Sequence, residues 1–149
     1  MVRANGAAVV ERELEDVFAY LADVASHVDW QSGALFVDPL TPPPLAAGSQ
    51  YLEVRQTLGR RYESVVEVVV CEAPFRLACR VVEGPVPYQF EYVLSESGPA
   101  ATRVEITLSG DAGVFFGVGD PILRSIAERE VAGSLGNMKD ILESRLDDA

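Results

Sequence analysis

The residues with the clearest chemical potential lie in a run of alternating segments between Ser49 and Leu108. Glu53 and Arg55 are two positions apart, so on one strand they point to the same face. A partly buried carboxylate can move a proton, and a guanidinium offers fixed donors to a carbonyl oxygen. Tyr62, on the next segment, adds a phenol that can polarise the same oxygen. These three residues predict acid/base chemistry on a carbonyl compound, and the alternative is an ion pair on an exposed strand.

Five segments of this region alternate apolar and polar side chains with the period of a β-strand. Short loops separate them, which predicts an antiparallel meander in which each strand pairs with the next. The expected strands cover residues 49–58, 61–72, 75–83, 87–95 and 102–110.

Loop lengths predict which residues of neighbouring strands face each other. A two-residue loop at Gly59-Arg60 places Tyr62 opposite Thr57 and Ser64 opposite Arg55. Cross-strand partners share a face of the sheet. The loop therefore predicts that Tyr62 and Ser64 lie on the same side as Arg55.

The next loop, at Ala73-Pro74, extends this assignment to a third strand. It places Glu67 opposite Arg80, a charge pair typical of a solvated face. It also places Cys79 on the inner face and Cys71 on the outer face, which predicts two free thiols.

The inner face of the sheet is expected to form one wall of a small-molecule pocket, because it mixes aromatic rings with a few polar groups. The other wall is a long helix with apolar residues at helical spacing, expected to run from Asp120-Pro121, taken as its N-cap and first-turn residue, to about Leu146. Aromatic packing alone would explain part of this composition. The expected binding residues are Tyr51, Ser64, Val66, Cys79, Tyr88, Phe90, Tyr92, Ser134 and Met138.

Two further features have open alternatives. The pair Phe115-Phe116 lies in a glycine-rich loop, where it is expected to be an exposed gate over the pocket, a dimer contact or a surface for another protein. His27, the single histidine, is either a general acid or base or a side chain packed at a helix end.

Composition restricts the partners. The 149 residues predict one domain, and the charge of -11 would repel phosphate backbones and anionic membranes. Neither a signal peptide nor a membrane span is evident, which favours a cytoplasmic protein with no nucleic-acid or membrane partner. One histidine and two cysteines predict no metal site, and no cofactor is expected.

Three segments resemble the START-like helix-grip superfamily, and within it the polyketide cyclase/dehydrase group. VFAYLADVASHVDW at 17–30 is similar to the first-helix signature, and SLGNMKDILE at 134–143 to the closing-helix pattern. RVVEGPVPYQFEY at 80–92 is similar to the central hairpin of aromatic polyketide cyclases. The resemblance implies that Trp30, at the end of the first segment, lines the cavity.

The same resemblance bears on the expected catalytic strand. Tyr62 matches an aromatic position of the family, but the places of the family's serine and arginine hold Val66 and Val68. Arg55, one strand away, would supply the cation in their place. Ser134 matches a helix position that often carries an amide, and offers a hydroxyl instead.

The sequence and the resemblance together predict an α+β helix-grip fold. In it, a curved seven-stranded antiparallel sheet wraps around a long C-terminal helix, with two short helices after the first strand. The leading hypothesis is a polyketide cyclase/dehydrase-like enzyme that binds a hydrophobic ligand or polyketide intermediate and promotes cyclisation or dehydration. The alternative is a carrier of a lipid, quinone or similar ligand. The expected catalytic residues are Glu53, Arg55 and Tyr62, and the expected binding residues also include Trp30, Val68 and Phe115.

Overall fold

A curved antiparallel sheet forms most of the molecule in the computed structural model, which describes residues 1–145. Its seven strands follow the order β1-β7-β6-β5-β4-β3-β2, so every pair of neighbours except β1 and β7 is consecutive in the chain. Period-two alternation of buried and exposed side chains produces this meander. The strands are β1 (Val2–Val10), β2 (Ala34–Pro39), β3 (Gln50–Thr57), β4 (Arg60–Glu72), β5 (Arg76–Glu83), β6 (Tyr88–Glu96) and β7 (Thr102–Gly110).

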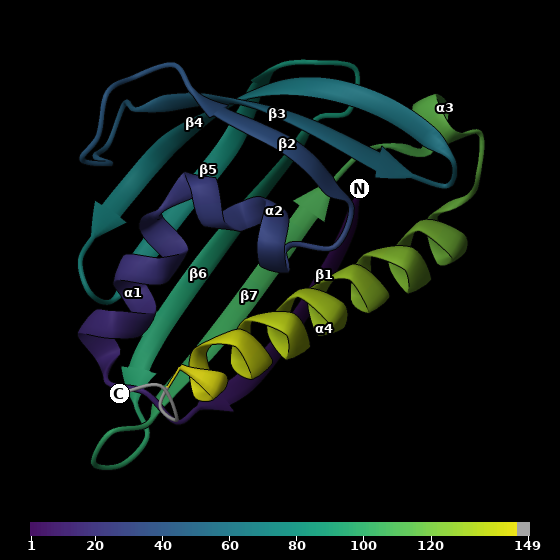
Figure 1. Ribbon diagram of the computed structural model, residues 1–149. Helices are drawn as coiled ribbons and strands as arrows, with labels where there is room; N and C mark the ends of the chain where they lie inside the picture. The colour runs from purple at the N-terminus through teal and green to yellow at the C-terminus, as the bar shows by residue number, and fades with distance from the viewer. Residues whose placement is uncertain (146–149) are drawn as a thin grey trace.

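The helices lie on the concave side of the sheet. The long α4 runs across the opening, and the short helices between β1 and β2 cover the remaining part (Figure 1). The sheet thus wraps around α4, which is the predicted helix-grip arrangement. The helical elements are α1 (Leu14–Ala22), the 3-10 helix η1 (Val24–Ser26), α2 (His27–Trp30), α3 (Gly113–Phe116) and α4 (Asp120–Ser144).

The hairpin between β3 and β4 turns one residue earlier than predicted. Leu58 and Gly59 have φ angles of 52° and 74°, which is the backbone of a type I′ turn. The register pairs Arg55 with Tyr62 and Glu53 with Ser64, so the predicted pairings of Tyr62 with Thr57 and of Ser64 with Arg55 are wrong. A shift of two residues leaves every side chain on its predicted face, because the side-chain period of a strand is two.

The next hairpin reaches the predicted register by a different route. Its turn has three residues, Ala73–Phe75, where the sequence predicted two. An irregularity in β4 between Val68 and Val70 compensates for the extra residue. Glu67 therefore lies opposite Arg80 as predicted, and their side chains form an ion pair of 3.3 Å.

The same irregularity moves Cys71 to the other face. Cys71 pairs with the buried Leu77 and packs against the core, so the prediction that it faces outward is wrong. Cys79 is buried as predicted, and both cysteines are free thiols. A β-bulge reverses the facing of all residues between it and the turn, and loop lengths alone do not reveal it.

The core lies between α4, α1 and the concave face of the sheet. The inward side of α4 repeats at helical spacing, as the sequence predicts, although Leu146 lies outside the described residues. Asp120 is the first helical residue rather than the N-cap, which is Gly119. Each fully buried Leu or Met removes apolar surface from water, worth about 1.5–3 kcal/mol. The buried residues of α4 are Leu123, Val131, Ser134, Leu135, Met138 and Leu142.

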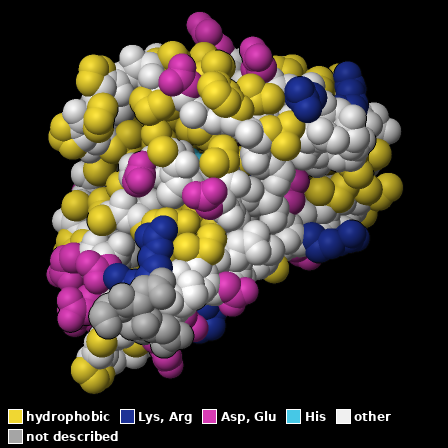
Figure 2. Space-filling view, in the orientation of Figure 1, with side chains coloured by type: hydrophobic (Ala, Val, Ile, Leu, Met, Phe, Trp, Pro, Cys, Tyr) yellow, Lys and Arg dark blue, Asp and Glu magenta, His cyan; other side chains and the backbone are white. Residues whose placement is uncertain are grey.

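Among the described residues, no helix combines the length and the apolar character needed to cross a membrane. Acidic side chains are spread over the face seen in Figure 2, in keeping with the net charge of -11.

Candidate functional site

A cavity lies between α4 and the concave face of the sheet, bounded also by α2 and α3. The space in which the centre of a water molecule can move is about 130 Å³. Most of its lining is aliphatic or aromatic, which suits a hydrophobic ligand. The polar side chains at its wall are Gln31, Arg55, Thr57, Glu130, Ser134 and the phenols of Tyr62, Tyr88 and Tyr92.

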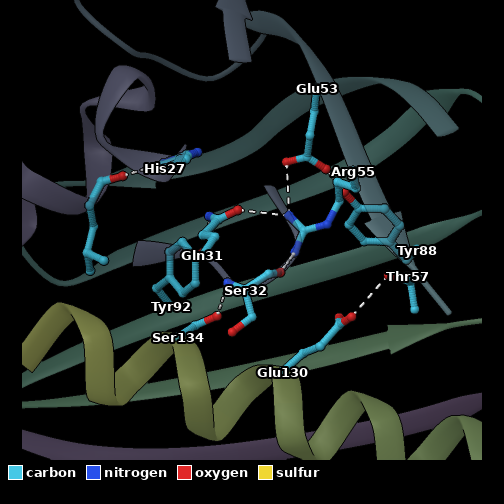
Figure 3. A network of polar contacts seen from close by, with 11 residues as sticks. His27, Gln31, Ser32, Glu53, Arg55, Thr57, Tyr88, Tyr92, Glu130 and Ser134 are labelled. Carbon is cyan, nitrogen blue, oxygen red and sulfur yellow. Dashed lines mark hydrogen bonds and ion pairs between the residues drawn. The ribbon is translucent and has the colours of Figure 1, made fainter. Parts of the chain in front are cut away.

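The guanidinium of Arg55 is the centre of the polar wall (Figure 3). Its Nη1 donates to Gln31 Oε1 at 3.0 Å, and its Nη2 donates to the carbonyl oxygen of Ser32 at 2.6 Å. Nη1 also lies 3.4 Å from Glu53 Oε2. Burial by itself would lower the pKa of Arg55, but the charge of Glu53, together with the phenols of Tyr88 and Tyr62 and the carboxylate of Glu130, outweighs this effect and the pKa is raised. Arg55 is therefore a permanent cation held in one orientation.

Glu53 lies behind Arg55 and does not line the cavity. Its side chain is fully buried, and Tyr88 donates its phenol proton to Glu53 Oε1. Burial raises the pKa of Tyr88 well above its ordinary value, and the charge of Glu53 adds to the effect. Tyr88 itself lines the cavity, so it is the hydrogen-bonded link between the cavity and the hidden carboxylate.

The segment after α2 completes this wall. Gln31 Nε2 donates to the phenol oxygen of Tyr92 at 2.9 Å, so the Gln31 amide joins Arg55 to Tyr92. The backbone N–H of Ser32 donates to Ser134 Oγ on α4 at 2.9 Å. These bonds attach the segment to both the sheet and the helix, which fixes the position of Arg55.

Glu130 forms the facing wall from α4. Its Oε1 accepts a hydrogen bond of 3.1 Å from Thr57 Oγ1 on β3, and both residues line the cavity (Figure 3). Burial raises the pKa of Glu130, and the opposing effects of Arg55 and Thr57 are smaller. A carboxyl group in this setting can exchange a proton closer to neutral pH than an exposed glutamate.

Aromatic rings make up much of the rest of the wall. Phe90 contacts Tyr92 with a centroid distance of 5.2 Å and stacks on Tyr88 at 6.2 Å. The ring of Trp30 packs on that of Tyr92 with a centroid distance of 5.8 Å, and its indole N–H donates a hydrogen bond of 3.1 Å to Ser26 Oγ. Such rings present rigid apolar faces to a ligand.

The short helix α3 closes one end. Tyr62 contacts the rings of Phe115 and Phe116 at 5.6 and 5.8 Å, so this pair is half-buried and the expectation of an exposed pair is wrong. Arg60 donates to the carbonyl oxygen of Phe115, and its guanidinium lies 4.0 Å from the ring centre. The exposed apolar side chain of α3 is Val114.

The residues that the sequence assigned to the site fall into two groups in the structure, those that line the cavity and those that do not. Seven of them line the cavity, and the others are buried behind its wall, with Phe115 half-buried at the closed end. Their expected roles stay predictions. The lining residues are Trp30, Arg55, Tyr62, Tyr88, Phe90, Tyr92 and Ser134, and the others are Tyr51, Glu53, Ser64, Val66, Val68, Cys79, Phe115 and Met138.

Gln31, Thr57 and Glu130 were not predicted from the sequence as site residues, although the expected register placed Thr57 on the inner face. Glu130 had a usable signal, because it lies four residues before Ser134 on the inward side of the predicted helix. Thr57 follows Arg55 by two positions and so shares its face of β3. Gln31 had no such signal, since it lies outside any periodic element.

His27 lies outside the cavity lining. Its ring is buried, Nε2 lies 2.9 Å from the carbonyl oxygen of Leu21, and Nδ1 has no hydrogen-bond partner among residues 1–145. Burial lowers the pKa of His27 below its ordinary value of 6.5. Its ring also packs edge-on against Trp30 and Tyr51. This environment favours the packing alternative.

The fold and the cavity define a helix-grip protein with an internal, largely apolar ligand site. The chain belongs to the family described as "Polyketide cyclase / dehydrase and lipid transport", whose model matches residues 1–143. The resemblance seen in the sequence is thereby confirmed. No curated protein matches this chain.

Solved structures with the same fold carry different names. The Zhui aromatase/cyclase from Streptomyces sp. R1128 is 18% identical, with a TM-score of 0.80 over 97% of this chain and 94% of that one. A START superfamily protein from Mycobacterium smegmatis is 13% identical, with a TM-score of 0.80 over 95% and 97%. Major latex-like protein 151 from Panax ginseng is 14% identical, with a TM-score of 0.70 over 94% and 96%. At these identities the likeness establishes the fold, and function must be argued from the site.

Proposed function

We propose that this protein binds a hydrophobic, oxygenated small molecule in its cavity and promotes its cyclisation or dehydration by proton transfer. The observation that supports this most directly is the guanidinium of Arg55 at the wall of a largely apolar cavity. A preorganised donor stabilises a developing enolate oxygen more strongly in such surroundings than in water. The family description, which includes cyclases and dehydrases, is in keeping with this chemistry.

In this proposal Arg55 and Tyr62 hold the carbonyl oxygen of the substrate. They are cross-strand partners on β3 and β4, and both line the cavity. Burial raises the pKa of Tyr62, so its phenol keeps the proton that it donates. The two donors would therefore meet one oxygen from adjacent strands.

Glu53 would accept the proton through Tyr88, because Glu53 itself does not reach the cavity. The phenol oxygen of Tyr88 would take the proton from the carbon beside the substrate carbonyl. The phenol proton of Tyr88 would pass at the same time to Glu53 Oε1, with which it is hydrogen-bonded. Confinement between the rings of Trp30 and Phe90 would hold the chain in a reactive conformation.

The test is turnover of a synthetic β-polyketone chain, followed by mass spectrometry for the loss of water and by absorbance of the ring formed. We expect Tyr88→Phe to lower kcat/KM about 100-fold or more while the affinity for the substrate stays within about threefold. Tyr20→Phe is the matched control, because Tyr20 is a buried tyrosine that does not line the cavity. Unchanged turnover in Tyr88→Phe would remove the proposed proton path.

The second candidate is a carrier that binds the ligand without reaction. It is favoured by the fact that Arg55 already has partners in Glu53, Gln31 and Ser32, which reduces what it can offer a substrate. Native mass spectrometry of the purified protein distinguishes the two. A co-purifying hydrophobic molecule that no variant or incubation converts would support the carrier, whereas a product formed from added polyketone would support the enzyme.

A further inference from the structure

The cavity wall carries two ionisable side chains of opposite sign that face each other. Arg55 comes from β3 and Glu130 from α4, and both belong to the lining. Their distance exceeds that of an ion pair, but both lie near Gly33. A Cβ atom on Gly33 would lie 3.8 Å from Arg55 Nη2 and 3.8 Å from Glu130 Oε1. The two groups therefore belong to one local charge system.

A third charge, behind the wall, changes the balance of this system. The fully buried Glu53 carboxylate lies 3.4 Å from Arg55 Nη1 and pairs with its charge. Two of the N–H donors of the guanidinium are already used in hydrogen bonds to Gln31 and Ser32. The positive charge of Arg55 is thus already compensated before any ligand enters, so it is a donor of hydrogen bonds rather than a free cation.

Glu130 is left without a cation of its own. It accepts one hydrogen bond, from the neutral hydroxyl of Thr57, and makes no ion pair among the described residues. The phenols that line the cavity are neutral, because burial raises the pKa of Tyr62, Tyr88 and Tyr92. With Glu130 ionised, the two carboxylates and one guanidinium around the cavity carry one net negative charge.

We propose that Glu130 makes the cavity selective for uncharged and cationic hydrophobic ligands and excludes hydrophobic carboxylates such as free fatty acids. A ligand carboxylate would bring a second uncompensated anion into an apolar space, where like charges repel more strongly than in water. A hydroxyl or ammonium group can instead donate a hydrogen bond to Glu130. This inference rests on the proposed binding of a hydrophobic ligand but is independent of catalysis.

The test uses three probes with the same ring system and different head groups: naphthalene-2-methanol, 2-naphthoate and naphthalen-2-ylmethylamine. Their dissociation constants are measured by calorimetry near neutral pH. We expect the wild-type protein to bind 2-naphthoate at least about tenfold more weakly than naphthalene-2-methanol. Glu130→Gln should bring the two within about threefold and weaken the amine.

Two variants separate the local charge from other effects. Glu128→Gln removes one charge from the exposed side of α4, so it should leave the discrimination against 2-naphthoate unchanged. Glu130→Asp keeps the charge and should keep the discrimination. Glutamine can still accept the hydrogen bond of Thr57, and a melting curve checks that the variant is folded.

Each outcome has a defined meaning. Equal binding of the alcohol and the carboxylate by the wild-type protein would overturn the selectivity and leave the proposed ligand site intact. Discrimination that persists in Glu130→Gln, or that Glu128→Gln relieves equally, would also overturn it. If none of the three probes binds, the proposed hydrophobic ligand site fails, and the selectivity fails with it.

Discussion

Glu53 Oε2 lies 3.4 Å from Arg55 Nη1, and the carboxylate of Glu53 has no exposed surface. The two residues are neighbours on one face of β3. Tyr88 donates a hydrogen bond to Glu53, and Arg55 donates to Gln31 and to the carbonyl oxygen of Ser32. A buried ion pair of this kind contributes less to net stability than to orientation, because desolvation offsets the attraction. Removing one partner of the pair is strongly destabilising, because the charge of the other partner then stays buried without compensation.

Replacement of Glu53 by glutamine should therefore destabilise the protein by roughly 3 kcal/mol, because Arg55 loses its charge partner. Urea unfolding measures the change. The control is Glu67→Gln, which breaks a half-exposed ion pair with Arg80 and should cost less than about 1 kcal/mol. Equal small effects of both substitutions would show that the burial of Glu53 does not matter energetically.

His27 should make stability depend on pH in a defined direction. Its pKa is lowered in the folded state by burial, so the unfolded chain binds more protons between that pKa and 6.5. Stability therefore rises with pH through this window and is lost as pH falls below 6.5. We expect the melting temperature of His27→Gln to fall less than that of the wild type as pH is lowered from 7 toward 5.

Nuclear magnetic resonance gives an independent test of the same group. The chain has one histidine, so the ring C–H resonances report its titration without overlap from another histidine. A midpoint below 6.5 is expected, and a midpoint at or above 6.5 would contradict the burial argument.

Loss of the Arg60 side chain should free α3. Arg60 donates to the carbonyl oxygen of Phe115 and covers its ring, whereas the adjacent Arg61 is exposed and makes no side-chain bond within the described residues. Arg60→Ala should increase amide hydrogen exchange in residues 113–117 and change global stability by less than about 1 kcal/mol. The control, Arg61→Ala, should leave exchange there unchanged. Exchange that does not respond to Arg60→Ala would mean that the ring contacts with Tyr62 hold α3 alone.

Substitutions of Met138 and Ile126 should affect different properties, the first mainly the stability of the fold and the second mainly the affinity for a ligand. Met138 is fully buried and lies outside the cavity lining, so Met138→Ala should cost about 2–5 kcal/mol with little change in affinity for naphthalene-2-methanol. Ile126 lines the cavity and is half-buried. Ile126→Ala should weaken binding of the same probe at a smaller cost in stability. A large loss of affinity in Met138→Ala would instead support the predicted binding role of Met138.

The alternation of side chains between 49 and 110 was enough to predict five strands, their order and the inward face. An error of two residues in the strand register leaves every side chain on its predicted face. The prediction therefore kept Glu53 and Arg55 on the inner face, although it misplaced the turn that lies at Leu58-Gly59. A β-bulge shifts the register by one residue and reverses the face, which is why the predicted outward direction of Cys71 is wrong.

The family resemblance carried the seven-stranded count and the helix-grip arrangement, which the fold confirms. Trp30 was expected at the cavity on the same grounds and does line it. These are properties of an ordered set of elements, and the short patterns at 17–30, 80–92 and 134–143 were enough to recognise that set.

Only the tertiary structure decided where the core ends and the cavity begins. Val66, Val68 and Arg55 share one inward face, yet only Arg55 reaches the open space. The difference depends on where α4 crosses the curved sheet, which no local pattern records. The same crossing brings Glu130 opposite Arg55 from a segment 75 positions later in the chain. Local alternation determines the direction of a side chain, whereas packing between distant elements determines what it meets.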